Sequence, residues 1–420
     1  MIDRDLEGAA ASSYDLLVIG GGMYGATLAL EAARRGLSTL LLERGDFGGE
    51  TTRSSLRILH GGLRYLQSLD LPRFRESVGE RRWFLRHFPD LVEPLPCLMP
   101  LHDPPRGGRL RRPGVFRLAL RVNDLLARER ALPPGRLLSA AETVELCPGV
   151  DRAGLRGGAL WYDAVAKDPE RLVWEVLGWA CRCGARALSH VEALELVVQD
   201  RKVTGLRAVD RASGRSLDFK ARRVVSCAGP WSRDLARRFD RDIPCLLRPA
   251  LAFNLLLDRE APSRAALAVA SREPGSQTWF LLPWEGRLLA GTAYAPVQGG
   301  TREEGPAEAR IGELLAALNA ALPGFDLRRS EVLDILWGRL PAVAEGSVEL
   351  ASRPVIVDHG RHGGPQGLVS VSGVKLTTAR AVARRILKVL GAASRSKETP
   401  SGFSQRDLAI NLAGGGRRGS

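Results

Sequence analysis

The sequence has no long apolar run and few residues suited to a metal site or a disulfide framework. No run of about 18 uncharged apolar residues occurs, which argues against a membrane-spanning helix. The six cysteines are scattered, without a C-x-x-C pair or a cluster with histidine, which favours free thiols in a reducing compartment and no metal site. The first residues are polar and acidic, unlike a secretory signal peptide. We therefore expect a cytoplasmic protein.

Acidic residues are also in short supply, because 47 of them face 61 basic residues and leave a formal net charge of +14. Arginines spread over solvated surfaces would account for this excess. No nucleic-acid partner is expected, because no basic run is interleaved with aromatic side chains that could stack on bases. With 420 residues and 45% hydrophobic content, the chain can bury a sizeable core in two or three lobes.

Residues 109–130 are the one basic segment with a pattern suited to a membrane surface. Apolar residues recur there at helical spacing, with arginines elsewhere around the helix. The apolar positions are Val115, Leu118, Val122, Leu125 and Leu126. An interfacial helix has this pattern, and so does a helix packed on its own domain. Peripheral contact with the inner face of the membrane and internal packing therefore both remain open.

A glycine-rich fingerprint near the N-terminus predicts a dinucleotide site. The apolar residues 16–19 meet Gly20, Gly22 and Gly25, and Glu43 closes the next apolar run. In this strand, loop, helix, strand and acid order, glycines let the backbone approach a pyrophosphate and the helix N-terminus offers N–H groups. Glu43 has the spacing of an acid that binds ribose hydroxyls, and it would repel the 2′-phosphate of NADP. A glycine-rich turn without a ligand is the alternative.

Apolar periodicity then divides the rest of the chain into predicted elements. Helices are expected over residues 73–88, 168–183 and 303–321, and strands over 191–198, 203–209, 222–226 and 367–372. The short apolar runs of residues 245–295 fit an antiparallel sheet. The proline-rich stretch 94–113 is interpreted as a crossing between lobes.

These elements predict an α/β fold in which a Rossmann-like FAD-binding domain is assembled from discontinuous segments, beside an α+β substrate domain built on an antiparallel sheet. A split nucleotide domain is more typical of flavoproteins than of NAD dehydrogenases. The expected segments are 14–95, 150–240 and 345–392 for the FAD-binding domain, 96–149 and 241–344 for the substrate domain, and 393–420 for a flexible tail rich in serine and glycine.

Several further motifs occur in a recognisable order after the glycine fingerprint. They are His60-Gly61-Gly62-Leu63-Arg64-Tyr65-Leu66, Ala228-Gly229-Pro230-Trp231, Pro283-Trp284, Gly291-Thr292 and Gly373-Val374-Lys375-Leu376-Thr377-Thr378. Over about residues 14–390 the chain resembles the FAD-dependent glycerol-3-phosphate dehydrogenases, within the D-amino-acid-oxidase-like flavoproteins. The H-G-G-L-R-Y-L and G-x-K-L-T-T segments are the specific parts of the resemblance.

The resemblance implies FAD as the cofactor. The helix that begins near Leu376 would aim its N-terminal N–H groups at the flavin pyrimidine edge, where negative charge accumulates on reduction. A turn before a surface helix is the alternative there. The implied cofactor-binding residues are Gly20, Gly22, Met23, Tyr24, Gly25, Glu43, Arg44, Thr51, Thr52, Ser54, Ser55, His60, Gly61, Gly62, Val191, Ala228, Gly229, Trp231, Gly373, Lys375, Leu376 and Thr377.

The resemblance also implies a small anionic secondary alcohol as the substrate, with sn-glycerol 3-phosphate first. His60 would take the alcohol proton as hydride leaves for flavin N5, with Arg64 beside it as a second catalytic residue. The implied substrate-binding residues are Arg64, Tyr65, Arg339, Arg353 and Lys375, since guanidinium groups bind phosphate through two hydrogen bonds. Quinone, oxygen or a protein carrier would reoxidise the flavin.

Other functions stay open at this point. His60 could be a structural histidine, the substrate could be an amino acid, a 2-hydroxy acid or a modified polyol phosphate, and the chain could bind flavin without turnover. The sequence departs from the family at two places: Leu251–Asn254 stand where the family has Lys-Gly-Ser-His, and Gly291–Tyr294 stand where it has G-T-T-D. The helical C-terminal domain of bacterial members is also missing from this sequence. These departures put the identity of the substrate in doubt, but not the binding of FAD.

Overall fold

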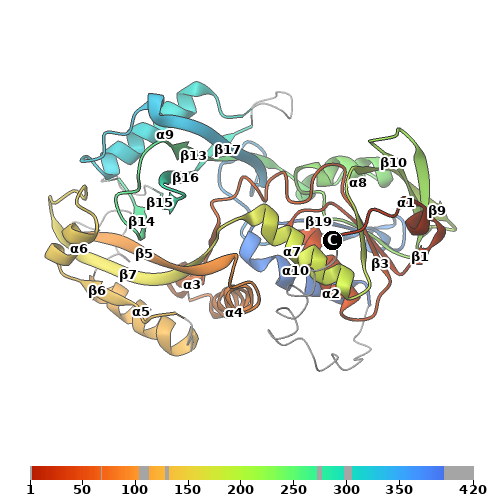
Figure 1. Ribbon diagram of the computed structural model, residues 1–420, viewed down its shortest axis with the longest axis horizontal. Coiled ribbons are helices and arrows are strands. Elements are labelled where there is room, and N and C mark those ends of the chain that lie inside the picture. The colour runs from red at the N-terminus through yellow and green to blue at the C-terminus, as the bar shows by residue number, and fades with distance from the viewer. Residues whose placement is uncertain are drawn as a thin grey trace, which may run out of the picture.

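The computed structural model describes residues 2–67, 69–103, 113–127, 132–271, 277–297 and 305–391. Two lobes lie side by side along the long axis of the molecule (Figure 1). The expected tail, residues 393–420, lies outside the described residues. The described strands form three sheets of six, four and nine strands, which confirms the predicted α/β fold with an α+β second lobe.

A six-stranded sheet is the centre of the first lobe. Its order is β18 (Val355–Asp358), β19 (Leu368–Ser372), β12 (Val224–Ser226), β2 (Leu16–Ile19), β3 (Thr39–Leu42) and β8 (Arg186–Leu188). Neighbouring strands are parallel except for β18 and β19. β2 and β3 are buried at every position, as expected for parallel strands covered on both faces.

Side chains of β2 alternate between the two faces of this sheet, and each face is covered differently. Leu16 and Val18 pack with α2 (Met23–Ala33), α7 (Pro169–Arg182) and α10 (Ala379–Val389). Leu17 and Ile19 pack with α1, α8 and the four-stranded sheet. The bounds of those elements are α1 (Leu6–Ala11), α8 (Ser232–Phe239), β1 (Ser13–Tyr14), β11 (Ser216–Ala221), β10 (Lys202–Asp210) and β9 (Val191–Gln199).

The second lobe is built on the nine-stranded sheet. Its order is β17 (Val332–Pro341), β13 (Pro249–Leu257), β16 (Arg287–Pro296), β15 (Trp279–Trp284), β14 (Ala266–Val269), β5 (Val92–His102), β7 (Leu155–Ala166) and β4 (Ile58–Leu59), with β6 (Arg136–Leu138) also paired to β7. α9 (Glu308–Ala321) packs on its outer face with Phe253 and Trp337. The opposite face, called the inner face below, carries Trp161, Leu256 and Leu336.

Three helices lie beside the inner face and its edge, and one lies near β6. They are α3 (Leu63–Gln67), α4 (Leu71–His87), α5 (Pro113–Ala127) and, near β6, α6 (Ala140–Leu146). α5 buries Phe116 and Leu120 in the inner-face cluster. The predicted basic helix is therefore confirmed within the described residues, and one of its sides packs on its own lobe.

The strand pairing corrects the expected boundaries between the lobes. β7 lies in a segment expected in the FAD-binding domain, yet it pairs with β4, β5 and β6. β5 crosses the expected boundary at residue 95 and includes the proline-rich stretch as far as His102. Pro94, Pro96 and Pro100 are separated by even numbers of residues, so their missing N–H groups lie on one edge of β5 and leave its pairing with β7 intact. The first part of the stretch interpreted as a crossing between lobes is therefore a strand of the second lobe.

A buried network of ion pairs links α4, α2 and α10. The Glu80 side chain is 2% exposed and accepts hydrogen bonds from Arg380 and Arg384 of α10. Arg380 also pairs with Glu31 of α2, and its guanidinium lies over the ring of Trp83. Because these buried charges have opposite partners, their desolvation is compensated. The network fixes the start of α10 relative to α2 and α4.

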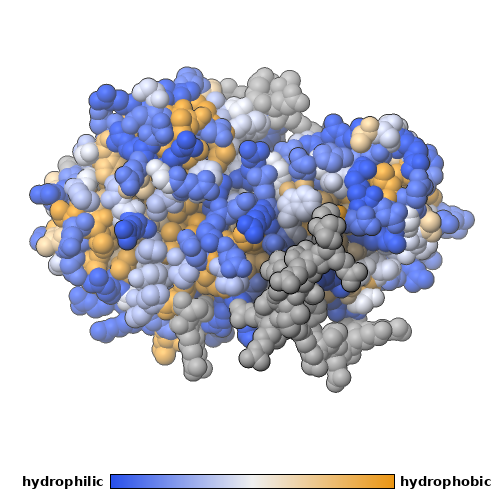
Figure 2. Space-filling model, in the orientation of Figure 1, coloured by the Kyte–Doolittle hydropathy of each residue, from blue (hydrophilic) through white to orange (hydrophobic). Residues whose placement is uncertain are grey.

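Across the described residues, no helix is long and apolar enough to cross a bilayer. All six cysteines are free thiols. Hydrophilic side chains cover most of the face shown in Figure 2, over both lobes.

Candidate active site

Four parallel strands of the central sheet end at the same edge, and the predicted cofactor residues follow them. β2 leads into Gly20–Gly22, β3 into Glu43, β12 into Ala228, and β19 into Gly373. Ligands of open α/β sheets bind outside the carboxyl ends of the strands. The structure therefore gathers the N-terminal fingerprint, the A-G-P-W turn and the G-x-K-L-T-T turn around one crevice, although they are far apart in sequence.

Glycine is required at two positions of the fingerprint. Gly20 has a φ of 103°, and a Cβ there would lie 2.6 Å from the carbonyl oxygen of Cys227. A Cβ on Gly25 would lie 1.8 Å from the carbonyl oxygen of Gly20. The N-cap of α2 is Gly22, which has no side chain to cap the helix N-terminus. This open helix N-terminus suits a pyrophosphate.

Glu43 closes one end of the crevice. Its carboxylate accepts hydrogen bonds from the amides of Gly21 at 2.6 Å and Gly45 at 2.8 Å. The amide of Val191 donates to the carbonyl oxygen of Glu43 at 2.8 Å, which places Val191 beside the predicted ribose acid. Arg44 follows β3 and Trp231 follows β12, and the Arg44 guanidinium lies 3.7 Å from the centre of the Trp231 ring. Glu43 and Arg44 therefore supply charged groups at this end of the crevice, and Trp231 supplies a flat aromatic face.

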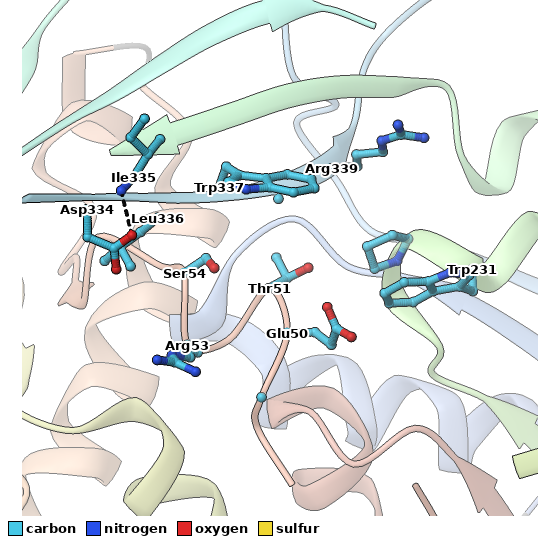
Figure 3. Close-up of a pocket in the computed structure, with 13 residues that line it drawn as sticks. Glu50, Thr51, Arg53, Ser54, Trp231, Asp334, Ile335, Leu336, Trp337 and Arg339 are labelled. Atoms are coloured by element: carbon cyan, nitrogen blue, oxygen red, sulfur yellow. Dashed lines mark hydrogen bonds between the residues drawn. The ribbon is translucent and has the colours of Figure 1, made fainter. Parts of the chain in front are cut away.

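The loop of residues 49–54 lies over the start of α2. The Met23 amide donates to the Thr52 hydroxyl at 3.2 Å, so this loop is fixed to the helix N-terminus. Between the loop, Trp231 and β17 lies a cleft of about 350 Å³ (Figure 3). The buried hydroxyls of Thr51 and Ser55 have no hydrogen-bond partner among the residues that the structure describes. They are donors and acceptors available to a polar ligand.

Tyr24, in the first turn of α2, fixes the opposite end of the crevice. Its hydroxyl accepts from the amides of Val374 at 3.1 Å and Lys375 at 3.2 Å and donates to the Lys375 carbonyl at 3.0 Å. Burial raises the pKa of Tyr24, so the phenol stays neutral and can donate. Gly373 packs against the Tyr24 ring, where a Cβ would clash. The η6 turn (Leu376–Thr378) that begins α10 is thereby held beside α2.

His60 lies at the end of β4, where the two lobes meet. Its Nδ1 is 3.1 Å from Oδ2 of Asp163 on β7, and its side chain is 44% exposed. The His60 ring also lies 5.2 Å from the Phe280 ring of β15. β4 contacts the η6 turn, so His60 is close to the segment that contains Lys375. The Nδ1 contact turns Nε2, on the other side of the ring, away from Asp163.

Asp163 is a buried carboxylate that the sequence analysis missed. Burial alone would raise its pKa, but the hydrogen bond and charge of His60, the charge of Arg81 and the Gly61 amide lower the pKa of Asp163 to about 2. Its Oδ1 accepts from the Gly61 amide at 2.6 Å and from Arg81 Nη1 at 3.0 Å. Trp161 Nε1 lies 3.3 Å from Oδ2. The carboxylate is therefore ionised at neutral pH and held by four donors.

A cationic group contacts Tyr65, which lies five residues after His60 in the sequence. Lys375 Nζ donates to the Tyr65 hydroxyl and lies 4.5 Å from the centre of the Tyr65 ring. The structure thus brings together two of the predicted substrate-binding residues, one from each end of the sequence. The side chain of Arg64 lies outside the described part of the structure, although its backbone is the second residue of α3.

Arg339 is not placed with this group. On β17 it pairs with Leu251, and alternation puts it on the outer face with Trp337, opposite the face of Leu336. In Figure 3 its side chain points away from Thr51 and the loop. Arg353 is exposed in the loop before β18. Arg339 nevertheless lines the cleft between the 49–54 loop, Trp231 and β17, so its role in binding the substrate phosphate stays a prediction.

Asn254, at the family's histidine position, is buried and fully used by the protein. Its amide nitrogen donates to the Ser54 carbonyl at 2.9 Å, and its oxygen accepts from the Thr292 hydroxyl at 2.8 Å. Asn254 therefore ties the inner face of the nine-stranded sheet to the cofactor loop. Asn254 as a whole is 3% exposed. This leaves its side chain no role as a proton acceptor.

A sequence signal exists for Asp163 but not for Arg81. Asp163 is the only charged residue in the apolar run 157–166, and a lone carboxylate in a buried strand needs a partner. Arg81 lies in the predicted helix 73–88 and is 2% exposed. Nothing in the local pattern separates it from the exposed Arg75 and Arg82.

The residues of the crevice fit FAD. The N-terminus of α2 suits the FAD pyrophosphate, and Glu43 suits a ribose. The hydroxyls of Thr51, in the 49–54 loop, and of Ser55, just after it, can bond a polar ligand. The Gly20 and Gly25 contacts remove the side chains that would block this approach. Each predicted cofactor residue follows a strand end or lies on a segment that packs against one.

Comparisons with known proteins agree with this crevice. A family model described as FAD dependent oxidoreductase (DAO) matches residues 15–388. The mitochondrial glycerol-3-phosphate dehydrogenase of Arabidopsis thaliana is 31% identical over 89% of this chain, which spans 60% of that protein. The glycerol-3-phosphate dehydrogenase of Synechocystis is 30% identical over 92% of this chain and 71% of its own length.

Solved structures share the fold. The glycerol-3-phosphate dehydrogenase from Bacillus halodurans, complexed with FAD, superimposes with a TM-score of 0.69 at 23% identity, covering 92% of this chain and 66% of that one. Glycine oxidase from Geobacillus kaustophilus gives a TM-score of 0.59 at 17% identity, over 90% of this chain and 95% of its own. The family match spans almost all of the described residues and confirms FAD as the cofactor. The chain belongs to the DAO family of FAD-dependent oxidoreductases.

Proposed function

We propose that the chain oxidises sn-glycerol 3-phosphate to dihydroxyacetone phosphate. The observation that carries this proposal is the His60–Asp163 pair, which presents a histidine ring next to the segment that holds Lys375. Two sequence relatives that match about 90% of the chain are named glycerol-3-phosphate dehydrogenases. A flavin-binding protein without turnover would need neither the histidine pair nor a cation beside it.

FAD, when bound, supplies the hydride acceptor at flavin N5. His60 Nε2 accepts the proton of the substrate hydroxyl while the carbinol carbon loses hydride, so that the alcohol becomes a ketone. Lys375 and Tyr65 hold the anionic end of the substrate, with Arg64 and Arg353 as further proposed contacts. Fixing the anion fixes the distance between the carbinol and His60.

The experiment is anaerobic reduction of the FAD-loaded protein by a panel of alcohols, 2-hydroxy acids and amino acids. We expect glycerol 3-phosphate to bleach the flavin absorbance faster than glycerol does. Replacing Lys375 with methionine should raise the substrate concentration for half-maximal bleaching about 10- to 100-fold, the range expected for a lost charge-assisted hydrogen bond. Oxidised flavin that glycerol 3-phosphate does not bleach would refute the proposal.

A different small anion is the second candidate, and Asn254 favours it. Asn254 stands where the family has a histidine, and its amide is bonded to the Ser54 carbonyl. The site therefore differs from the family pattern at this position. Bleaching by an amino acid, a 2-hydroxy acid or another polyol phosphate, with glycerol 3-phosphate inactive, would select this candidate.

We further propose peripheral contact with a membrane through α5, where a quinone would accept the electrons. Two leucines of the predicted apolar stripe are exposed, Leu118 at 64% and Leu125 at 69%, and Arg117 and Arg121 are exposed on the same helix. An interfacial helix combines such leucines with arginines that meet anionic headgroups. The Val115 side chain lies outside the described part of the helix.

The membrane proposal predicts co-sedimentation of the holoenzyme with anionic phospholipid vesicles. Replacing both Leu118 and Leu125 with aspartate should lower the bound fraction at least about 10-fold, because two buried apolar side chains are each worth about 1.5–3 kcal/mol. Leu333→Asp is the matched control, since Leu333 is 47% exposed on β17. Equal sedimentation of the double variant and the control would count against a membrane role for α5.

A further inference from the structure

We propose that Asp163 is a positioning residue for the reaction: it holds His60 as the Nδ1–H tautomer, so that Nε2 keeps its lone pair for the substrate proton, and Arg81 holds Asp163. This inference deepens the proposed oxidation of an alcohol and rests on it. Asp163 does not touch substrate in this scheme. It acts through the orientation and tautomer of His60.

The tautomer follows from what each atom can donate. An ionised carboxylate only accepts hydrogen bonds. His60 Nδ1 lies 3.1 Å from Asp163 Oδ2, so Nδ1 must carry the hydrogen of the neutral ring. The other nitrogen, Nε2, is then an acceptor. With the opposite tautomer, two lone pairs would face each other at Nδ1, and Nε2 could not take a proton.

The carboxylate cannot turn without losing hydrogen bonds. Oδ1 is held by the Gly61 amide at 2.6 Å and Arg81 Nη1 at 3.0 Å, and Oδ2 meets His60 and Trp161 Nε1. Arg81 also donates to the Tyr162 carbonyl at 2.9 Å, which fixes the guanidinium to β7. A 2% exposed arginine beside a buried carboxylate compensates its charge.

Gly61 makes this arrangement possible. A Cβ at residue 61 would lie 2.0 Å from Arg81 Nη1, so a larger residue would displace the guanidinium. The first glycine of the H-G-G segment therefore serves the Arg81–Asp163 contact, in addition to any approach of the cofactor. One sequence motif thus supplies both the histidine and the space for the group that orients it.

The charges around Asp163 come from three elements. His60 follows β4, Arg81 projects from α4, and Cys97 lies on β5. Burial and the neighbouring Asp163 raise the pKa of the Cys97 thiol well above its usual value, so this thiol stays neutral. A carboxylate next to an imidazole favours the protonated imidazole.

The test is Asp163→Asn in the FAD-loaded protein. With the asparagine oxygen kept on Gly61 and Arg81, its NH2 group faces His60 Nδ1, which must then accept and carry its hydrogen on Nε2 instead. We expect flavin reduction to slow about 100-fold. Because a negative charge is lost, the acid limb of the pH profile of kcat/KM should move to lower pH.

Asp240→Asn is the matched control. Asp240 accepts from Nδ1 of His359 at 2.8 Å, in a second histidine–carboxylate pair. His359 is buried beside Ser370 of β19. The control should lower thermal stability without moving the pH profile. A pH profile of Asp163→Asn identical to that of the control would overturn the inference.

Nitrogen NMR of histidine-labelled holoenzyme gives a readout that needs no turnover. The chain has six histidines, and a His60→Gln spectrum assigns the His60 signals. We expect a protonated Nδ1 and an unprotonated Nε2 in the neutral ring of the wild type, and the reverse in Asp163→Asn. A wild-type His60 with its hydrogen on Nε2 overturns the inference, even if Asp163→Asn fails to fold. Should no substrate bleach the flavin, the proposed function fails while this spectrum still decides the role of Asp163.

Discussion

Replacing His60 with alanine is expected to slow reduction of the bound flavin by about 10²- to 10⁴-fold, the contribution typical of a general base. The side chain is partly exposed and its Nδ1 is held by Asp163, so its loss removes the proton acceptor and leaves the carboxylate under Arg81 in place. Stopped-flow mixing with glycerol 3-phosphate under anaerobic conditions measures this rate directly.

The FAD content of the His60→Ala protein should stay close to that of the wild type, because the glycine fingerprint and the 49–54 loop are untouched. His362→Ala is a suitable control, since His362 is exposed in the η5 turn (His359–His362). An unchanged reduction rate in His60→Ala would show that another group takes the proton. A loss of FAD with no change in rate per flavin would assign His60 to cofactor binding.

Gly25→Ala is expected to have the largest effect on cofactor binding. An alanine Cβ would lie 1.8 Å from the Gly20 carbonyl oxygen, so α2 must move away from the loop that receives the pyrophosphate. Overpacking of this kind costs about 3 kcal/mol, a large share of the stability of a typical domain. The purified variant should carry little FAD and unfold at a lower temperature.

Gly312→Ala separates crowding from any general effect of helix glycines. Gly312 is exposed in α9 and no atom lies within 4 Å of the position of an added Cβ, so alanine should stabilise the protein by about 1 kcal/mol. The flavin-to-protein absorbance ratio and the melting temperature report both variants. If Gly25→Ala kept its FAD and its melting temperature, α2 would not pack against Gly20 as described.

Much of the first lobe could be predicted from the sequence, because its signals are local. The glycines of residues 20–25 and the buried run 39–42 specify a strand, a loop and a strand within about 25 residues. The helices α4, α7 and α9 match their predicted periodicity. Tyr24, two residues after Gly22, brings the Lys375 segment to the start of α2, because its hydroxyl bonds both residues that precede η6.

Strand pairing in the second lobe could not be predicted in the same way. Whether Arg339 faces the pocket depends on its register against Leu251, nearly 90 residues away, and a shift of one residue reverses the face. Asp163 depends likewise on the contact between β7 and the residues after β4. A side chain that is positioned by pairing between distant strands leaves no local periodic pattern in the sequence. The sequence motif therefore identified His60 but not Asp163, which contacts it.

The central sheet has a consequence for how the protein is made. β2 lies between β3 and β12, and β19 joins beyond β12, so the sheet combines strands from the start, the middle and the end of the described chain. At roughly 5–20 residues per second on a ribosome, the first strands wait tens of seconds for the last. We expect the nascent chain to take up FAD only after the turn at Leu376–Thr378 has left the exit tunnel, which makes cofactor uptake a late event in biosynthesis.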